Sequence, residues 1–419
     1  MHADIRRELA GHLEDLIEEK QSKGMSEEQA ISEAIRQMGD PQTLGKGLHK
    51  IHRPKTPWSL ISALLIFSAI SLTGLSSVEA AGALPQPDFN LVRNQMIYLL
   101  LGCLIMCGMY FIDFRKLQRG VWWLYGGAIA GIVYSVLYGF SAGGSRYFLA
   151  KGGFAIDFIS YSPYILLIGL AGILSQTKTA VNINKLRGVW IDLTVLFIPV
   201  CAFWWAGVWP ELLTYLICAL VLYTWITGAW LRSIIAGGLI LISGTAYVWN
   251  NQQIRQRITG AFNHTLDPDG SGYVYKVLNE TFAAAGWRGH GFGARLESLP
   301  YLYTDMLPAY LINCFGWSGG LLLIAAAVWF FIRLFSAFKA VREPYGRAVI
   351  LVLSLMLALR IAYGLSIISG KMVLTSLPFP FLNYGNHVLI EFAVLGLLMG
   401  IYRRKDIIPA QENERGAAA

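Results

Sequence analysis

The sequence predicts an all-α polytopic membrane protein with about ten transmembrane helices and a small cytoplasmic helical domain at its N-terminus. Of the 419 residues, 55% are hydrophobic and only 14% are Asp, Glu, Lys or Arg, against roughly a quarter in soluble domains. The charged residues gather near both ends of the chain and between long apolar runs. The net charge of +8 therefore does not indicate nucleic-acid binding, because basic residues in such places are typical of cytoplasmic loops.

The first 52 residues predict a separate helical domain. Apolar side chains recur at helical spacing from Ile5 to Ile17, and Gly24 ends this first helix. Ser26-Glu27-Glu28-Gln29 is a capping box that starts a second helix, whose apolar stripe runs from Ala30 to Met38. A third short helix is expected to begin at Asp40-Pro41. The domain resembles the helical prefix domains found ahead of some bacterial permeases, where it would be a passive insertion aid or a regulatory docking module.

Ten apolar segments are long enough to cross a membrane, since about 20 apolar residues span a hydrocarbon core of roughly 30 Å. They lie near residues 57–77, 95–113, 120–141, 155–175, 188–206, 210–229, 233–250, 306–334, 346–368 and 384–402. No cleavable signal peptide precedes the first of them, and basic residues concentrate in alternate loops, which favours ten spans with both termini in the cytoplasm. The membrane domain therefore covers residues 56–405, and residues 406–419 form a cytoplasmic tail that we expect to be disordered.

One polar segment breaks this alternation. Residues 251–305 are too polar to span the membrane and fall in an extracytoplasmic loop. A loop of about 55 residues among short neighbours is usually either functional or disordered. Its aromatic and apolar residues indicate an ordered loop with an interfacial helix near 273–285. We therefore expect the function of the chain to reside in this loop, which ends at Asp305.

A series of short motifs resembles one family of membrane proteins. Within the loop these motifs are Arg255-Gln256-Arg257-Ile258, Leu266-Asp267-Pro268, Gly270-Ser271-Gly272-Tyr273, Gly286-Trp287-Arg288-Gly289-His290-Gly291, Leu299-Pro300 and Thr304-Asp305. Outside it they are Gly144-Ser145-Arg146-Tyr147, Trp209-Pro210-Glu211-Leu212-Leu213-Thr214 and Leu377-Pro378-Phe379-Pro380-Phe381-Leu382-Asn383-Tyr384-Gly385. The ordered set, over about residues 60–403, is similar to the SEDS family (shape, elongation, division and sporulation), which includes RodA, FtsW and SpoVE.

The resemblance implies ten spans with a large outer loop between the seventh and the eighth. It also implies a peptidoglycan glycosyltransferase that polymerises lipid II, an undecaprenyl-pyrophosphate-linked disaccharide peptide, at the outer face of the bacterial cytoplasmic membrane. Family members usually act with a class B penicillin-binding protein in cell division or cell-shape maintenance. The Asp of the family's Thr-Asp pair is catalytic, which implies that Asp305 is the catalytic residue here and that Thr304 and Tyr384 are among the substrate-binding residues.

The reaction explains why these residue types would be needed. The 4-hydroxyl of the acceptor sugar attacks the anomeric carbon of the donor, and a carboxylate such as Asp305 can take the hydroxyl proton as general base. The lipid-linked pyrophosphate leaves, and basic groups stabilise its charge. Guanidinium groups match phosphate oxygens, so the candidates are Arg146, Arg255, Arg257 and Arg288. A divalent cation, Mg²⁺ or Mn²⁺, could share this task, but the sequence assigns no residue to a metal.

The candidates in the loop also have structural interpretations. Asp305 could cap the N-terminus of the eighth span, where a negative charge favours the helix dipole. The arginines could instead form salt bridges with the loop carboxylates Asp267, Asp269 and Glu280. Residues 267–272 favour a turn over a calcium loop, because position twelve of the loop is Leu278 rather than Glu.

Three ionisable residues lie inside predicted spans, namely Asp192, Arg360 and Glu391. Ionisable groups at such depth usually face a cavity or a partner. We expect an Arg360–Glu391 ion pair that holds two spans together, with the lining of a lipid II groove as the alternative.

The chain departs from the family at several positions. Tyr301 stands where the family has Glu, Asn313 and Cys314 stand where it often has paired glutamates, and Asn386 replaces a residue of its Ser-Tyr-Gly-Gly-Ser stretch. These departures support a second hypothesis, in which the chain is a non-catalytic SEDS-like scaffold or a lipid-precursor-binding regulator of a partner cell-wall synthase. Transport of the lipid precursor is a third and less favoured hypothesis, because no inverted repeat is evident.

Overall fold

The computed structural model describes residues 2–39, 57–83, 89–141, 147–151, 154–180, 185–296, 298–341, 343–368, 370, 372–375 and 377–404. The chain divides into two compact units, one of residues 1–56 with 402–419 and the other of residues 57–401. We refer to the second as the membrane unit.

The N-terminal unit contains two helices that contact each other, α1 (His2–Ser22) and α2 (Glu27–Met38). Ala30 and Ala34 are fully buried on α2, whereas Ile35 of the predicted apolar stripe is 55% exposed. Ser26 is the N-cap residue of α2, but its side chain makes no capping hydrogen bond, so the predicted capping box is wrong in that detail. The third helix predicted from Asp40 lies outside the described residues.

Nine helices in the described part of the membrane unit are long and apolar enough to cross a membrane. They are α4 (Trp58–Ala80), α5 (Leu91–Phe111), α7 (Val121–Tyr138), α8 (Phe158–Ala180), α9 (Lys185–Ala206), α10 (Trp209–Thr227), α11 (Trp230–Asn250), α14 (Leu307–Ala340) and α15 (Pro344–Ile367). The tenth predicted span is α16 (His387–Arg403), whose 17 residues give a helix of only about 26 Å. The described fold is that of an all-α polytopic membrane protein.

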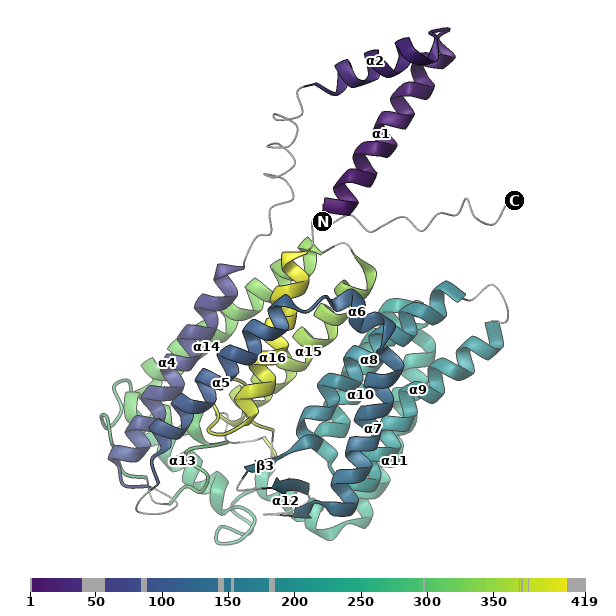
Figure 1. Ribbon diagram of the computed structural model, residues 1–419. Helices are drawn as coiled ribbons and strands as arrows, with labels where there is room; N and C mark the ends of the chain where they lie inside the picture. The colour runs from purple at the N-terminus through teal and green to yellow at the C-terminus, as the bar shows by residue number, and fades with distance from the viewer. Residues whose placement is uncertain are drawn as a thin grey trace. The chain divides into compact units, whose positions relative to one another are not determined.

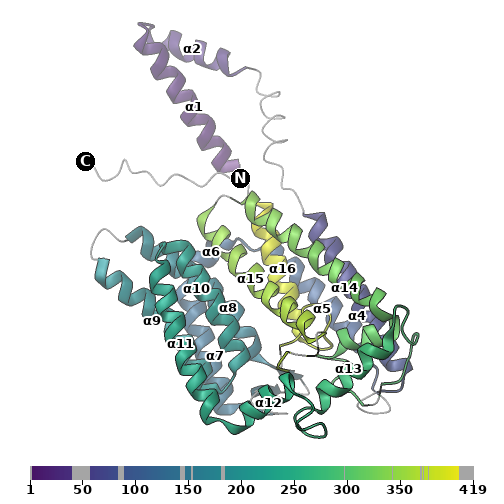
Figure 2. The same ribbon diagram turned by 180° about the vertical axis from the view of Figure 1, so that it is seen from behind.

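The helices of the membrane unit form two groups, with α4, α5, α14, α15 and α16 in one and α7 to α11 in the other (Figures 1 and 2). Contacts of α15 with α8 and α10 join the groups. The short helix α6 (Phe114–Arg119) stands between α5 and α7 in the chain. One end of the unit, the lower end in Figure 1, carries α12 (Gln252–Phe262) and α13 (Tyr273–Ala285), and we call it the loop end.

The predicted large loop is ordered, and α13 confirms the helix expected near 273–285. A small antiparallel sheet before α8 was not predicted; it comprises β1 (Phe140–Ser141), β2 (Tyr147–Lys151) and β3 (Phe154–Ile156). The side-chain amide of Asn386 donates to the backbone carbonyl of Ala155 in β3. This bond ties the sheet to the segment that precedes α16.

Helix α14 is broken at Gly316, whose φ of 69° and ψ of −169° are not helical. The turn Gly286–Gly291 lies against the break. Three backbone hydrogen bonds of 2.9 Å join the two segments: His290 N–H to the Asn313 carbonyl, Gly291 N–H to the Cys314 carbonyl, and Trp317 N–H to the Gly286 carbonyl. A Cβ atom at Gly289 would lie 2.4 Å from the carbonyl oxygen of Cys314. The glycine-rich motif therefore replaces helical hydrogen bonds that the break removes.

The core of the first helix group forms around an irregular segment, residues 377–386, that precedes α16. The ring of Phe381 in this segment is fully buried, and its centroid lies 5.9 Å from that of Phe67 on α4 and 5.6 Å from that of Phe330 on α14. Buried aromatic rings in such pairs add packing energy beyond their area. The segment is thus a packed part of the protein, which we call the buried segment.

Candidate functional site

Asp305 lies in a turn of residues 302–306, immediately before α14, and is half-buried. The N-cap position of α14 is Met306. Asp305 therefore lies one residue before the N-cap position of the helix. Its side chain lies at the loop end of a long apolar helix, partly covered by the protein and partly exposed.

The turn that holds Asp305 is formed by the backbone of Tyr301. The Tyr301 carbonyl accepts hydrogen bonds from the N–H groups of Thr304 at 3.1 Å and Met306 at 3.2 Å, and from the Thr304 hydroxyl at 3.3 Å. Tyr301 has a φ of 60°, which is a rare backbone conformation for a bulky residue. In this structure Thr304 thus shapes the turn, and the Tyr301 side chain is 63% exposed beside it.

Tyr384 of the buried segment lies next to this turn, as predicted for a site residue. Its N–H donates to the carbonyl of Tyr303 at 3.2 Å, and the two rings meet edge to face with centroids 6.0 Å apart. The rings of Tyr98 and Phe89 flank it at 6.1 Å and 5.8 Å. The side chain of Asn94 forms a hydrogen bond with the Tyr384 hydroxyl. The structure therefore brings Thr304, Asp305 and Tyr384 together, beside aromatic residues that the sequence did not indicate.

Polar side chains from neighbouring helices fix the buried segment near Tyr384. The Ser71 hydroxyl of α4 donates to the carbonyl of Leu382 at 2.9 Å. On α5, the Gln95 carboxamide accepts from the N–H of Gly385 at 3.2 Å and donates to the carbonyl of Asn383 at 3.4 Å. Both Ser71 and Gln95 are fully buried. The backbone that presents Tyr384 is therefore held on both sides by groups within the protein.

Two tyrosines lie in the electric field of predicted site residues. The charge of Asp305 acts on the hydroxyl of Tyr363, near the loop end of α15, and so does Tyr275 of α13. Arg257 of α12 in turn acts on Tyr275: burial raises the pKa of that phenol, while the Leu374 N–H and the Arg257 charge oppose the rise. Neither tyrosine was predicted from the sequence, because no local pattern distinguishes them from other helical aromatics.

The predicted phosphate-binding arginines are only partly brought to the site. Arg255 and Arg257 are exposed on α12, and Arg288 is exposed on the turn that docks on α14. Among the described residues no ion pair joins these arginines to the carboxylates Asp267, Asp269 or Glu280, so the predicted structural salt bridges are absent. Arg146 lies outside the described residues.

Residues 267–272 form the turn that the sequence favoured. The Asp267 carboxylate accepts from the N–H of Ser271 at 2.8 Å and from its hydroxyl at 3.1 Å. These hydrogen bonds from Ser271 lower the pKa of Asp267. Across the described residues, no group of three His, Cys, Asp or Glu side chains could hold a metal ion.

The predicted Arg360–Glu391 ion pair is wrong. Both side chains are fully buried, but the Arg360 guanidinium donates to the backbone carbonyl of Ser160 at 3.2 Å. Glu391 accepts from the N–H of Phe381 at 2.6 Å. The charges of Arg360 and Glu391 act on each other without a direct contact. Each side chain takes a backbone partner, because the start of α8 offers a carbonyl to Arg360 and the buried segment offers an N–H to Glu391.

Ser160 also joins two buried carboxylates that the sequence analysis did not single out. Its hydroxyl lies 2.6 Å from the Asp157 carboxylate and 3.3 Å from that of Glu211 in the first turn of α10. Asp192, on α9, is buried as predicted for an ionisable group inside a span. Asp157, Ser160, Glu211 and Arg360 thus form a polar cluster near the loop end of the bundle.

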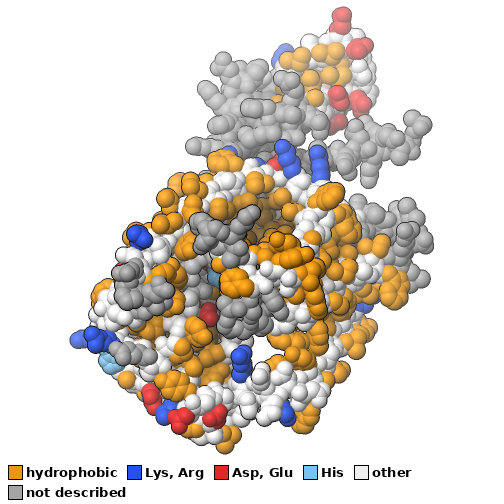
Figure 3. All heavy atoms as spheres, turned by 60° about the horizontal axis from the view of Figure 1, so that its bottom comes forward, with side chains coloured by type: hydrophobic (Ala, Val, Ile, Leu, Met, Phe, Trp, Pro, Cys, Tyr) orange, Lys and Arg blue, Asp and Glu red, His pale blue; other side chains and the backbone are white. Residues whose placement is uncertain are grey.

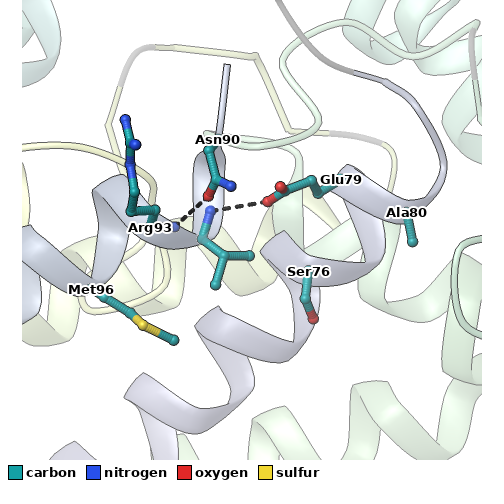
Figure 4. A pocket seen from close by; sticks show the side chains of 7 residues that line it. Ser76, Glu79, Ala80, Asn90, Arg93 and Met96 are labelled. Carbon is teal, nitrogen blue, oxygen red and sulfur yellow. Dashed lines mark hydrogen bonds between the residues drawn. The ribbon is translucent and has the colours of Figure 1, made fainter. Parts of the chain in front are cut away.

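A cavity of about 400 Å³ opens between the loop-end termini of α4 and α5. It is lined by Ser76, Glu79, Ala80, Asn90, Val92, Arg93 and Met96 (Figure 4). Glu79 accepts from the N–H of Val92 at 3.1 Å, and Asn90 accepts from the N–H of Arg93 at 2.7 Å. These bonds cap α5, so the polar lining has a structural role, and none of the predicted site residues belongs to it.

The face of the loop end mixes charged and hydrophobic side chains and is hollowed near its centre (Figure 3). Comparisons with known proteins bear on what this face does. Residues 55–407 match the family model FTSW_RODA_SPOVE, described as cell cycle protein. The chain is 24% identical over 376 residues to the peptidoglycan glycosyltransferase MrdB of Escherichia coli K12, covering 86% of this chain and 96% of that protein.

Two further relatives extend the comparison. The stage V sporulation protein E of Bacillus subtilis is 25% identical over 367 residues, covering 81% of this chain and 96% of that protein. The fold matches, with a TM-score of 0.69 and 20% identity, a chain in a structure concerned with the coordination of polymerization and crosslinking by a peptidoglycan synthase complex. The match covers 84% of this chain and 98% of that one.

Proposed function

Since the chain belongs to the FTSW_RODA_SPOVE family of cell cycle proteins, the SEDS family, we propose that it is a peptidoglycan glycosyltransferase that polymerises lipid II for cell-wall synthesis. The observation that carries the proposal is the placement of Asp305, half-buried at the loop end of α14, in a turn whose Tyr303 carbonyl accepts a hydrogen bond from the Tyr384 N–H. Full-length relatives of the same family, among them MrdB, are peptidoglycan glycosyltransferases by name.

In the proposed reaction, the sugar 4-hydroxyl of the acceptor attacks the anomeric carbon of the donor. Asp305 takes the hydroxyl proton as the new glycosidic bond forms, and the bond from the anomeric carbon to the pyrophosphate breaks. A half-buried carboxylate suits this role, because loss of solvent weakens its hydration and makes it a better base. Because Thr304 belongs to the turn of Asp305 and Tyr384 lies beside it, these two residues are the candidates to contact the sugars.

The leaving pyrophosphate needs positive charge. We favour Arg257 among the described candidates, because it lies on α12, which contacts α13, its charge acts on Tyr275 of α13, and a guanidinium can bind phosphate oxygens in pairs. Arg255 lies on the same helix, two residues before Arg257. Arg255 and Arg288 would contact the substrate only if the substrate extends over the loop end. A Mg²⁺ or Mn²⁺ ion would depend mainly on the pyrophosphate for its ligands, because the described residues provide no metal-binding cluster.

We further propose that a class B penicillin-binding protein is the partner of this chain and that membrane lipids surround its membrane-spanning helices. The related synthase structure, which concerns a peptidoglycan synthase complex, supports such a partnership. In the proposed orientation the loop end faces the outside of the bacterial cytoplasmic membrane and both termini are cytoplasmic, as the distribution of basic residues favours.

Tyr301 favours the alternative of a non-catalytic scaffold or lipid-precursor-binding regulator. It replaces a glutamate of the family pattern, and it does so at the residue whose carbonyl forms the Asp305 turn. If the missing carboxylate were needed for chemistry, the chain could still bind the lipid precursor and regulate a partner synthase.

Polymerisation of labelled lipid II by the purified protein tests the proposal. We expect Asp305→Ala and Asp305→Asn to lower the rate by about 100-fold or more, the range of a lost general base. Asp269→Asn, an exposed carboxylate of the same loop, is the matched control and should keep the wild-type rate. Equal rates for wild type and Asp305→Ala would refute the assignment of Asp305. Binding of lipid II without any polymer would favour the regulatory alternative.

A further inference from the structure

Three consecutive residues between α15 and α16 are held by two phenols from different parts of the chain. The Tyr363 hydroxyl of α15 accepts from the N–H of Thr375 at 2.6 Å and lies 3.0 Å from the carbonyl of Val373, to which it donates. The Tyr275 hydroxyl of α13 accepts from the N–H of Leu374 at 2.9 Å. We call Val373–Thr375 the clamped segment.

The clamped segment has no helical or strand hydrogen bonds of its own. Its conformation therefore depends on side chains, and two of its N–H groups use the two phenols. Tyr275 is 4% exposed, and Tyr363 is half-buried, so water competes little for these bonds. Loss of either hydroxyl would leave a shielded N–H without its partner.

The two phenols also link the surroundings of the two charged groups of the proposed site. The clamped segment precedes the buried segment in the chain, and the Tyr384 N–H of the buried segment donates to the Tyr303 carbonyl in the Asp305 turn at 3.2 Å. Tyr275 lies on α13, which contacts α12, the helix of Arg257. The contacts thus run from α12, through α13 and the clamped segment, to the turn before α14, and the charges of Asp305 and Arg257 act on Tyr363 and Tyr275 respectively. These elements are separate in sequence, and the clamped segment is where hydrogen bonds connect α13 to α15.

We propose that Tyr275 and Tyr363 are positioning residues that, through the clamped segment, fix the separation between Asp305 and Arg257. This inference rests on the proposed function, in which Asp305 is the base and Arg257 binds the pyrophosphate. Base and phosphate must be held at a set distance, because the reacting carbon lies between them. A misplacement of about 1 Å can cost roughly 100-fold in rate even when the altered residue is remote from the chemistry.

The Tyr→Phe changes remove only the hydroxyls and keep the packed rings. We expect Tyr275→Phe and Tyr363→Phe each to lower kcat for lipid II polymerisation by about tenfold or more, with KM changed less than kcat. The double variant should be little worse than either single variant, because both act through one segment. The matched control is Tyr345→Phe at the other end of α15, whose buried hydroxyl has no hydrogen-bond partner among the described residues.

Hydrogen exchange gives a readout that does not need activity. Each single variant should speed exchange in residues 372–375 and in the turn 302–306, whereas Tyr345→Phe should change neither. Unchanged exchange in α8 would show that the variant still folds. The inference is overturned if exchange in both segments stays at the wild-type rate, or if it rises while kcat does not fall. If Asp305→Ala were fully active, the proposed base would be lost, and exchange would still decide whether the clamp holds the turn.

Discussion

Gly289→Ala offers a direct test of how the large loop is anchored to α14. At this position φ is +70°, and a Cβ atom would lie 2.4 Å from the Cys314 oxygen and 2.4 Å from the Gly316 nitrogen. Real Cβ contacts essentially never fall under 3.0 Å, so the turn must move away from α14 by about 0.6 Å (3.0 less 2.4 Å). Two residues later, Gly291 also has a positive φ, +94°, but nothing lies within 4 Å of its Cβ position.

Alanine substitutions at the two glycines separate the cost of left-handed backbone strain from the cost of a steric collision with α14. An alanine in the left-handed region costs about 1–2 kcal/mol at either position. At Gly289 the collision adds a further cost, because the two segments share three backbone hydrogen bonds of 2.9 Å, each worth about 0.5–1.5 kcal/mol net. If two of the three are lost or stretched, Gly289→Ala should be less stable than Gly291→Ala by about 1–3 kcal/mol.

Thermal unfolding in detergent, followed by the fluorescence of the 13 tryptophans, measures this difference. The melting temperature should be lowest for Gly289→Ala and intermediate for Gly291→Ala. Gly244→Ala is the baseline, because Gly244 lies within α11 with open space at its Cβ position, and alanine is the better helix former. Equal melting temperatures for Gly289→Ala and Gly291→Ala would show that the loop does not depend on its docking to the break in α14.

Two further predictions concern the loop itself. Tyr301→Gly should stabilise the protein by about 0.5–1 kcal/mol, because relief of left-handed backbone strain, about 1–2 kcal/mol, exceeds the entropy cost of glycine, about 0.4–1 kcal/mol. Tyr301→Ala is the control, because alanine keeps the strain. A gain in stability with alanine as large as with glycine would contradict the explanation. The pKa of Asp267 is lowered in the folded protein. Its ionised form therefore stabilises the turn fully at pH values above the ordinary Asp pKa of about 3.9. This contribution disappears as the pH falls through the lower pKa of the folded state. Hydrogen exchange of residues 266–272 should therefore differ between wild type and Asp267→Ala at neutral pH and converge in acid, and a difference that persists in acid would rule out the carboxylate as its source.

Sequence patterns predicted the parts of the fold that depend on residues close together in the chain. Apolar length predicted the spans, and the apolar and aromatic spacing near 273–285 predicted α13. The position of Asp305 followed from the end of the polar stretch. The break in α14 could not be predicted in this way, because Gly316 would be a tolerable helix residue without the turn Gly286–Gly291 to supply replacement hydrogen bonds. That partner lies about one helix length upstream, where no periodicity links the two segments.

The sequence indicates the position of the proposed base, but not the residues that support it. Thr304, Asp305 and Tyr384 come from motifs, and the structure brings them together. The tyrosines at 275 and 363 are positioned by tertiary contacts alone. Each sits in a helix where an aromatic residue has an ordinary packing role, so the sequence offers no reason to prefer these two among 20 tyrosines.

The error over Arg360 and Glu391 shows why the buried segment can exist at all. Irregular backbone at membrane depth is tolerated only where protein groups satisfy its polar atoms. Phe381 has a φ of 64° and a fully buried ring, so its N–H cannot join a helix and must find an acceptor inside the protein. Glu391 is that acceptor. Without an acceptor this buried N–H would be unsatisfied, at a cost of about 1–3 kcal/mol. The intramembrane carboxylate therefore stabilises the segment that presents Tyr384 to the proposed site, rather than joining two spans.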